Sequence, residues 1–156
     1  MKFIIASVGH KMPDWITTGF REYTKRMPRE AKIELVEIRP EPRTTGKTVA
    51  QIMEAEAQRV IASIPLNCLR IVLDEHGAQL TTKQLAVQMQ GWMQEGCDIA
   101  FMIGGADGLH DSVKQVAQKT LALSALTLPH ALVRVLLAEQ LYRAYSLLHN
   151  HPYHRE

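Results

Sequence analysis

The 156-residue chain has few of the features that mark secreted, membrane-spanning or metal-binding proteins. Its two cysteines, Cys68 and Cys97, lie far apart and form no CxxC pair. Their spacing excludes a disulfide scaffold and a cysteine zinc site, and indicates reduced thiols. No apolar run approaches the roughly 18 residues of a membrane span, and the run at 3–8 is too short for a signal peptide. We therefore expect a cytoplasmic protein with no membrane or metal partner.

The chain also lacks a strong charge of either sign. Its formal net charge is +2, and apolar residues (46%) and charged residues (22%) have ordinary globular proportions. This length predicts a single domain over residues 1–156. Residues 1–47 hold ten basic residues against six acidic ones. Such a mild local excess fits an RNA-facing surface and solvated helix faces equally well.

Strand and helix patterns alternate along the sequence. Runs rich in β-branched residues predict strands, and apolar residues three and four apart predict amphipathic helices. The expected strands cover 2–9, 32–38, 69–77, 98–105 and an extended segment 121–129, and the expected helices cover 13–27, 48–64, 81–96, 111–119 and 130–150. This alternation predicts an α/β fold with a mostly parallel sheet flanked by helices. Ligands of such sheets bind at the carboxyl ends of the strands, here at 73–74, 103–105 and 127–129.

Several familiar motifs are incomplete. The GKT at 46–48 lacks the glycine that a P-loop needs five residues before Gly46, because Glu41 stands there. GGADG does not satisfy GxGxxG, since Ala106 replaces the second glycine. The histidines near the C-terminus have no carboxylate or cysteine at ligand spacing, so we expect no metal site. Ser124 lacks the GxSxG setting of a hydrolase nucleophile.

The stretch FMIGGADGL, residues 101–109, is an apolar strand that ends in a glycine loop. Glycines let backbone groups approach a flat ligand closely. The segment LSALTLP, residues 123–129, offers main-chain groups and little side-chain chemistry. Together they point to a ligand held mainly by main chain, such as an adenosine moiety. From these residues alone, a tight turn that ends a core strand is equally consistent.

The last predicted helix, 130–150, is apolar nearly all round, so it must bury most of its circumference. One side can pack on the sheet, and the other calls for a partner subunit. Arg134 lies on an apolar side, where it either snorkels to solvent or is held where an anion or RNA binds. We favour the second interpretation. The polar arc of the helix consists of Glu139, Gln140, Arg143 and Ser146.

The sequence resembles the ribosomal RNA large subunit methyltransferase H family of the SPOUT superfamily. The resemblance is carried by FMIGGADGL, LSALTLPHALVRVLLAEQLYRAY, the terminal NHPYHRE and the N-terminal VGHKMPDWITTGFREYTKR. It spans nearly the whole chain and is least distinctive at 40–67. Small departures at 74–76 and 106–107 cast no doubt on the activity. The family implies a SPOUT-type domain with a C-terminal trefoil knot, an arrangement that general fold rules treat as nearly forbidden.

The resemblance also implies the cofactor and the substrate. The cofactor is S-adenosyl-L-methionine, and the reaction methylates N3 of a pseudouridine in 23S ribosomal RNA of the large subunit, within the ribosome. The enzyme acts as a homodimer. The implied cofactor-binding residues are Leu73, Gly104, Leu123, Ser124, Ala125, Leu126, Thr127 and Leu128. We expect Gly104 to tolerate no side chain, because a Cβ would enter the space of the adenosine.

Methylation at N3 requires a group that takes the N3 proton and donors for the flanking carbonyls. The first candidates are Tyr153, which can stack on a base, His154, which can exchange a proton, and Arg155, which can bind a phosphate or carbonyl. For this tail, a frayed polar terminus is the alternative. Further catalytic candidates are His130, Arg134 and Arg143.

Two other functions stay open at this point. The first is a non-catalytic ribosome- or RNA-binding protein with a vestigial adenosine pocket, which would not bind S-adenosylmethionine. The second is an α/β enzyme that uses another adenosine cofactor. The sequence does not say which side chain accepts the N3 proton, or whether free RNA, the 50S subunit or the 70S ribosome is the substrate.

Overall fold

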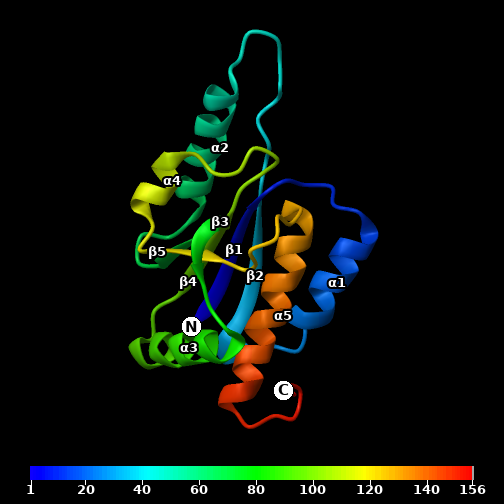
Figure 1. Ribbon diagram of the computed structural model, residues 1–156, viewed down its shortest axis with the longest axis vertical. Helices are drawn as coiled ribbons and strands as arrows, with labels where there is room; N and C mark the ends of the chain where they lie inside the picture. Colours follow the sequence, from blue (N-terminus) through cyan, green and yellow to red (C-terminus); the bar gives the residue numbers. More distant parts are fainter. Residues whose placement is uncertain (156) are drawn as a thin grey trace.

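The computed structural model describes residues 1–155, so Glu156, at the end of the predicted catalytic tail, lies outside the described residues. Five parallel strands form one central sheet in the order β2-β1-β4-β3-β5 (Figure 1). The strands are β1 (Lys2–Val8), β2 (Lys32–Ile38), β3 (Leu69–Gln79), β4 (Ile99–Ile103) and β5 (Lys119–Ala122). The predicted α/β class and parallel sheet are confirmed.

Helices cover both faces of this sheet, as the parallel connections require. One core cluster packs α3 and α5 against the sheet, with α1 beside α5, and the other packs α2 and α4 against the opposite face (Figure 1). The helices are α1 (Asp14–Thr24), α2 (Val49–Ser63), α3 (Thr82–Glu95), α4 (Asp111–Val116) and α5 (His130–Leu148), with a 3-10 turn at Arg29–Ala31. None of the helices in the described part of the chain is long and apolar enough to cross a bilayer.

The continuous apolar runs in the sequence correspond to strands that are buried on both faces. In β1, Phe3 and Ile5 belong to one core cluster, whereas Ile4 and Ala6 belong to the other. Every residue of β4 is buried as well. Because alternate residues of a strand point to opposite faces, such a strand has no polar side, which explains why these segments lack a polar–apolar alternation.

Two helices begin where the sequence places polar caps. Thr48 and Thr81 each accept a hydrogen bond from the backbone three residues later, at Gln51 and Gln84, and these glutamines bond back to the cap residue. These reciprocal pairs satisfy amide groups that the first helical turn leaves open. The end of α3 is formed by Gly96, whose φ of 72° is a left-handed conformation that glycine adopts without cost.

The prediction of an extended segment over 121–129 is wrong beyond its first two residues. The edge strand β5 ends at Ala122, and residues 123–129 form a loop that leads into α5. The Ser124 hydroxyl accepts a hydrogen bond from the Leu126 amide at 2.9 Å. A local turn of this kind satisfies backbone groups that would otherwise need a neighbouring strand. The fourth helix also ends earlier than expected, at Val116.

A register shift interrupts the pairing of β3 with β5. Leu73 and Ala78 both pair with Leu121, so the four residues between them are extruded from the ladder. At Gly77, a Cβ would lie 2.7 Å from the Leu121 carbonyl carbon, so only glycine fits this crossing. The bulge carries residues 74–76 out of the sheet, at the edge where a ligand is expected.

Candidate active site

A cavity of about 620 Å³ lies at the carboxyl edge of the sheet. Its volume is within the usual range for small-molecule sites. Three loops line it: the bulge of β3, the glycine loop after β4, and the loop that joins β5 to α5. Seven of the eight predicted cofactor-binding residues line this cavity, namely Leu73, Gly104, Leu123, Ser124, Leu126, Thr127 and Leu128. The eighth, Ala125, is exposed and lies outside the lining.

The glycine loop after β4 is a tight turn held by its own backbone. The Gly108 amide donates to the Gly105 carbonyl at 3.0 Å, and Gly108 has a φ of 81°. A Cβ on Gly104 would lie 2.5 Å from the backbone carbonyl carbon of Gly108. The expectation that a Cβ on Gly104 would enter the space of the adenosine is therefore wrong. Gly104 is needed because the loop folds back on it, and the shape of the cavity follows from that fold.

The loop between β5 and α5 is tied across the cavity to the β3 bulge. The Thr127 hydroxyl donates to the Glu75 carboxylate at 3.0 Å. Together with the Ser124 turn, this contact fixes a segment in which Leu126 stays 73% exposed. The loop thus lines the cavity with a segment whose Leu126 side chain stays largely open to solvent.

Acidic side chains with basic partners surround the cavity. Lys114 on α4 lies 2.6 Å from the Asp74 carboxylate, and Arg43, from the loop before α2, lies 2.5 Å from Asp107. Burial by itself would raise the pKa of Asp74, but the Lys114 ammonium and the His76 amide outweigh it and lower that pKa. The Asp74 carboxylate is therefore ionised at neutral pH and joins the bulge to α4.

His130, the first residue of α5, forms part of the cavity wall. Burial lowers the pKa of its imidazole, and the Arg134 guanidinium lowers it further, against a weaker opposing effect of Glu56. The ring is therefore neutral at neutral pH. Among residues 1–155, no hydrogen bond to this side chain is found. Its ring nitrogen lies against Gly9, at 3.6 Å from the position of a Cβ there.

Arg134 is 1% exposed, so neither interpretation of it from the sequence holds. Its guanidinium donates to the Glu37 carboxylate at 3.0 Å and to the Ser7 hydroxyl at 3.1 Å. The remaining Nε has no partner among the described residues. A buried arginine must be paired to be tolerated, and this one is paired with β1 and β2. It therefore does not receive an anion or RNA, and it acts on the cavity through its field at His130.

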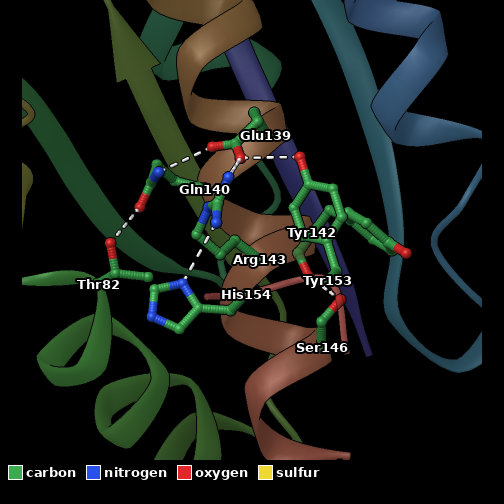
Figure 2. A network of polar contacts seen from close by, with 8 residues as sticks. All are labelled: Thr82, Glu139, Gln140, Tyr142, Arg143, Ser146, Tyr153 and His154. Atoms are coloured by element: carbon green, nitrogen blue, oxygen red, sulfur yellow. Dashed lines mark hydrogen bonds and ion pairs between the residues drawn. The ribbon is translucent and has the colours of Figure 1, made fainter. Parts of the chain in front are cut away.

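The C-terminal tail is packed on α5 (Figure 2). Tyr153 donates from its hydroxyl to the Glu139 carboxylate at 3.0 Å. Arg143 bonds to the same carboxylate and also lies 3.2 Å from Nδ1 of His154. The structure thus brings together three of the catalytic candidates, Tyr153, His154 and Arg143. Arg143 and Glu139 both belong to the predicted polar arc. Ser146, also assigned to that arc, is buried and donates to the Tyr142 carbonyl at 2.9 Å.

The tail and the cavity of one chain lie at opposite ends of α5. The helix starts at the cavity wall and runs away from it to the tail (Figure 1). Its 19 residues span about 28 Å. Tyr153 reaches back only to Glu139, and neither it nor His154 nor Arg155 lines the cavity. The tail therefore does not cover the cavity of its own chain.

Some parts of the site gave no usable signal in the sequence. Met53 on α2 reaches the cavity from a segment in which no motif is present. The pairing of Arg43 with Asp107 joins two loops far apart in sequence, and only the fold brings them together. The contact of Glu139 with the tail had a partial signal in the sequence, because Glu139 lies on the polar arc of an otherwise apolar helix. Residues 1–155 hold no cluster of three His, Cys, Asp or Glu side chains placed to bind a metal ion.

Comparison with known proteins identifies the family. The family described as "Predicted SPOUT methyltransferase" matches residues 1–154. The chain belongs to the SPOUT methyltransferase family. Relatives of this SPOUT methyltransferase include "Ribosomal RNA large subunit methyltransferase H" of Nitrosospira multiformis, 60% identical over 99% of both chains, and that of Ralstonia pickettii, 58% identical over 99% of both. A third, from Methylobacillus flagellatus, is 55% identical over the full length of both chains.

Two solved structures share the fold of this SPOUT methyltransferase. A probable methyltransferase from Bordetella pertussis has a TM-score of 0.58 at 15% identity and covers 92% of each chain. A probable methylase family protein from Haemophilus influenzae has a TM-score of 0.54 at 12% identity, covering 99% of this chain and 70% of that one. These comparisons confirm the family that the sequence resembles and its fold class.

Proposed function

We propose that this methyltransferase uses S-adenosylmethionine to methylate N3 of a pseudouridine in 23S ribosomal RNA. The printed name of its relatives, at 55–60% identity over full length, supports a large-subunit ribosomal RNA substrate. The observation that carries the proposal in the structure is the cavity formed by the glycine loop and the loop 123–129. A ribosomal substrate is found in the cytoplasm, where we expect the enzyme to act.

The cavity fits an adenosine-based methyl donor. It is large enough for one, and two of its three walls are the glycine loop and the largely apolar loop 123–129. Gly105 lies against Val8, where a Cβ would be 3.1 Å from the valine side chain. The residues that would hold the donor are the seven predicted cofactor-binding residues that line the cavity. When bound, S-adenosylmethionine supplies an activated methyl group on a sulfonium, and carboxylates such as Glu75 at the cavity favour a cation.

We further propose that each site is shared between two subunits. The tail cannot reach its own cavity, so a second copy must bring its tail there if Tyr153, His154 and Arg155 act on the RNA. An exposed apolar surface supports this arrangement. Trp15 at the start of α1 is 63% exposed, and Leu132 and Leu136 on the adjoining α5 are half-buried. Apolar surface of this kind is typical of an interface between copies.

Within a shared site, some residues would position the base and another would accept its N3 proton. The protein must place N3 of the base in line with the methyl group, which is a positioning task. Tyr153 offers an aromatic ring to the base, and Arg155 offers donors to a phosphate or carbonyl. His130 is a neutral imidazole on the cavity wall, so it can accept the N3 proton at a ring nitrogen.

Calorimetric titration with S-adenosylmethionine tests the cofactor proposal. We expect one binding site per chain, with an affinity that Thr127→Val reduces, because that change breaks the bond from the cavity loop to Glu75. Val87→Thr, on the exposed face of α3, is the control and should bind normally. Absence of binding to the wild-type protein would favour the non-catalytic ribosome-binding alternative.

A further inference from the structure

One carboxylate connects the C-terminal tail to the body of the protein. Oε1 of Glu139 accepts from Nε of Arg143 at 2.8 Å, from Nη2 at 2.5 Å and from the Tyr153 hydroxyl at 3.0 Å (Figure 2). Oε2 accepts from the Gln140 amide at 2.7 Å, and Gln140 in turn accepts from the Thr82 hydroxyl of α3 at 2.8 Å. The Glu139 side chain is only 14% exposed. A shielded carboxylate with charged donors makes strong hydrogen bonds, so this anchor is rigid.

Aromatic contacts hold the Tyr153 ring in the same place. Its centre lies 4.7 Å from the centre of the Tyr142 ring, edge to face, and the Arg143 guanidinium lies 4.7 Å from it. The Arg26 guanidinium, from the turn that follows α1, lies 5.9 Å away. Burial first, and then the bond to Glu139, raise the pKa of Tyr153 to about 12, against the opposing charge of Arg143. Tyr153 therefore keeps its proton at neutral pH, and its hydroxyl donates a hydrogen bond to Glu139.

The contact between Arg143 and His154 fixes the state of the imidazole. Nη1 of Arg143 lies 3.2 Å from Nδ1 of His154. A guanidinium can only donate, so Nδ1 must be the acceptor, and the proton of the neutral ring sits on Nε2. In this state His154 has no ring nitrogen available to accept another proton. It presents an N–H donor instead.

We propose that Glu139 and Arg143 are positioning residues that hold the tail as a set of hydrogen-bond donors, so that the tail binds the carbonyls of the target base and does not take the N3 proton. Nε2–H of His154 and the guanidinium of Arg155 are the donors. The proton leaves N3 for a group outside the tail. This inference rests on the proposed role of the tail in the shared site, and it differs from the expectation that His154 exchanges the proton.

Nitrogen-15 NMR of the histidine side chains tests this inference in the full-length protein. We expect His154, assigned by its loss in His154→Asn, to be in the Nε2–H state in the wild type. Glu139→Ala should convert it to a mixture of both tautomers, because Arg143 loses its anchor. The matched control is Glu54→Gln, which removes an exposed carboxylate from α2 and should leave the His154 signals unchanged. A wild-type His154 that carries its proton on Nδ1 would overturn the inference.

Glu139→Gln gives a second readout that does not depend on loss of the tail. It keeps an oxygen acceptor but removes the charge, so the phenolate titration of Tyr153, assigned by difference from Tyr153→Phe, should move to lower pH. An unchanged midpoint would contradict the anchoring role. In methyl transfer, Glu139→Ala should lower kcat by about 10²-fold and change the S-adenosylmethionine Kd by less than about twofold.

Failure of this inference and failure of the proposed function give different results. If deleting the tail leaves methyl transfer unchanged, the proposed role of the tail is wrong, whatever the NMR spectra show. If the deletion abolishes transfer but His154 titrates with the pH dependence of kcat, the tail is catalytic and the donor-only assignment is wrong.

Discussion

Single residues determine the shape and the charge state of the cavity. Gly104 fixes the glycine loop, and His130 lines the wall as a neutral imidazole. Burial first, and then the guanidinium of the buried Arg134, lower the pKa of that imidazole. Only the first of these roles had a strong sequence signal, the two adjacent glycines. The charge state of His130 depends on burial and on a guanidinium one helical turn away, which no motif encodes.

Gly104→Val should abolish S-adenosylmethionine binding and also lower the stability of the protein. The new side chain meets the Gly108 backbone, which has no flexible end to move away. The expected loss in the free energy of unfolding is about 1–3 kcal/mol, typical of overpacking. Gly91→Ala is the matched control, since nothing lies within 4 Å of a Cβ on Gly91 in α3. Urea unfolding and calorimetry measure both effects, and normal binding by Gly104→Val would refute the placement of the loop.

The pH dependence of stability should reveal His130. Its pKa in the folded state is lower than in the unfolded chain, so protonation favours unfolding. The contribution is fully present above the ordinary histidine pKa of about 6.5 and is lost as the pH falls through the lowered value. His130→Gln should therefore lose less stability than the wild type between neutral and mildly acidic pH. Val87→Thr, at an exposed position of α3, changes no titrating group and should behave as the wild type does. Equal slopes for His130→Gln and the wild type would contradict this account.

At the scale of elements, the sequence predicted the order and type of nearly every strand and helix. Apolar runs identified β1 and β4 because both faces of these strands are buried, and helical spacing of apolar residues identified α2 and α3. The segment 121–129 was predicted wrongly because an apolar run at a sheet edge resembles a strand, although its Leu126 amide bonds to the Ser124 hydroxyl. The bulge of β3 was missed, since it depends on the pairing with β5.

The fold alone does not reveal the function of the C-terminal tail. Its deletion tests whether the tail takes part in methyl transfer. Deleting residues 152–156 should leave S-adenosylmethionine binding nearly unchanged, because the seven cavity-lining residues proposed to hold the donor all lie outside the tail. Methyl transfer should fall by about 10²-fold or more, since the base is no longer positioned. Sedimentation should still show the same oligomer. Transfer at the normal rate would mean that the catalytic groups lie among His130 and its neighbours.

At the scale of the whole molecule, the separation of cavity and tail underlies the proposed shared site, because a tail that acts at a cavity must come from a second copy of the chain. Nothing in the periodicity of the sequence indicated this separation. It follows from the length of α5 and from the direction in which the helix leaves the sheet. The apolar character of α5 predicted a partner subunit, and the exposed Trp15 adds to that surface. The C-terminal knot implied by the resemblance stays a prediction.

Mixed dimers test the shared site. Gly104→Val lacks a working cavity, and the protein without residues 152–156 lacks a tail, so each should be inactive alone. After subunit exchange at equal amounts, half of the dimers are mixed and each has one intact site. The expected methyl-transfer rate is about a quarter of the wild-type rate. Two inactive proteins that stay inactive after exchange, with mixed dimers shown by mass spectrometry, would refute sharing.

The central claim is that this chain methylates N3 of a pseudouridine in 23S ribosomal RNA with S-adenosylmethionine as donor. The most direct measurement incubates the protein and labelled donor with free 23S RNA, 50S subunits and 70S ribosomes that lack the modification, and identifies the product nucleoside by mass spectrometry. We predict N3-methylpseudouridine at a single site, formed on ribosomal particles. No methyl incorporation into any of the three substrates, by protein that binds the donor, would contradict the account.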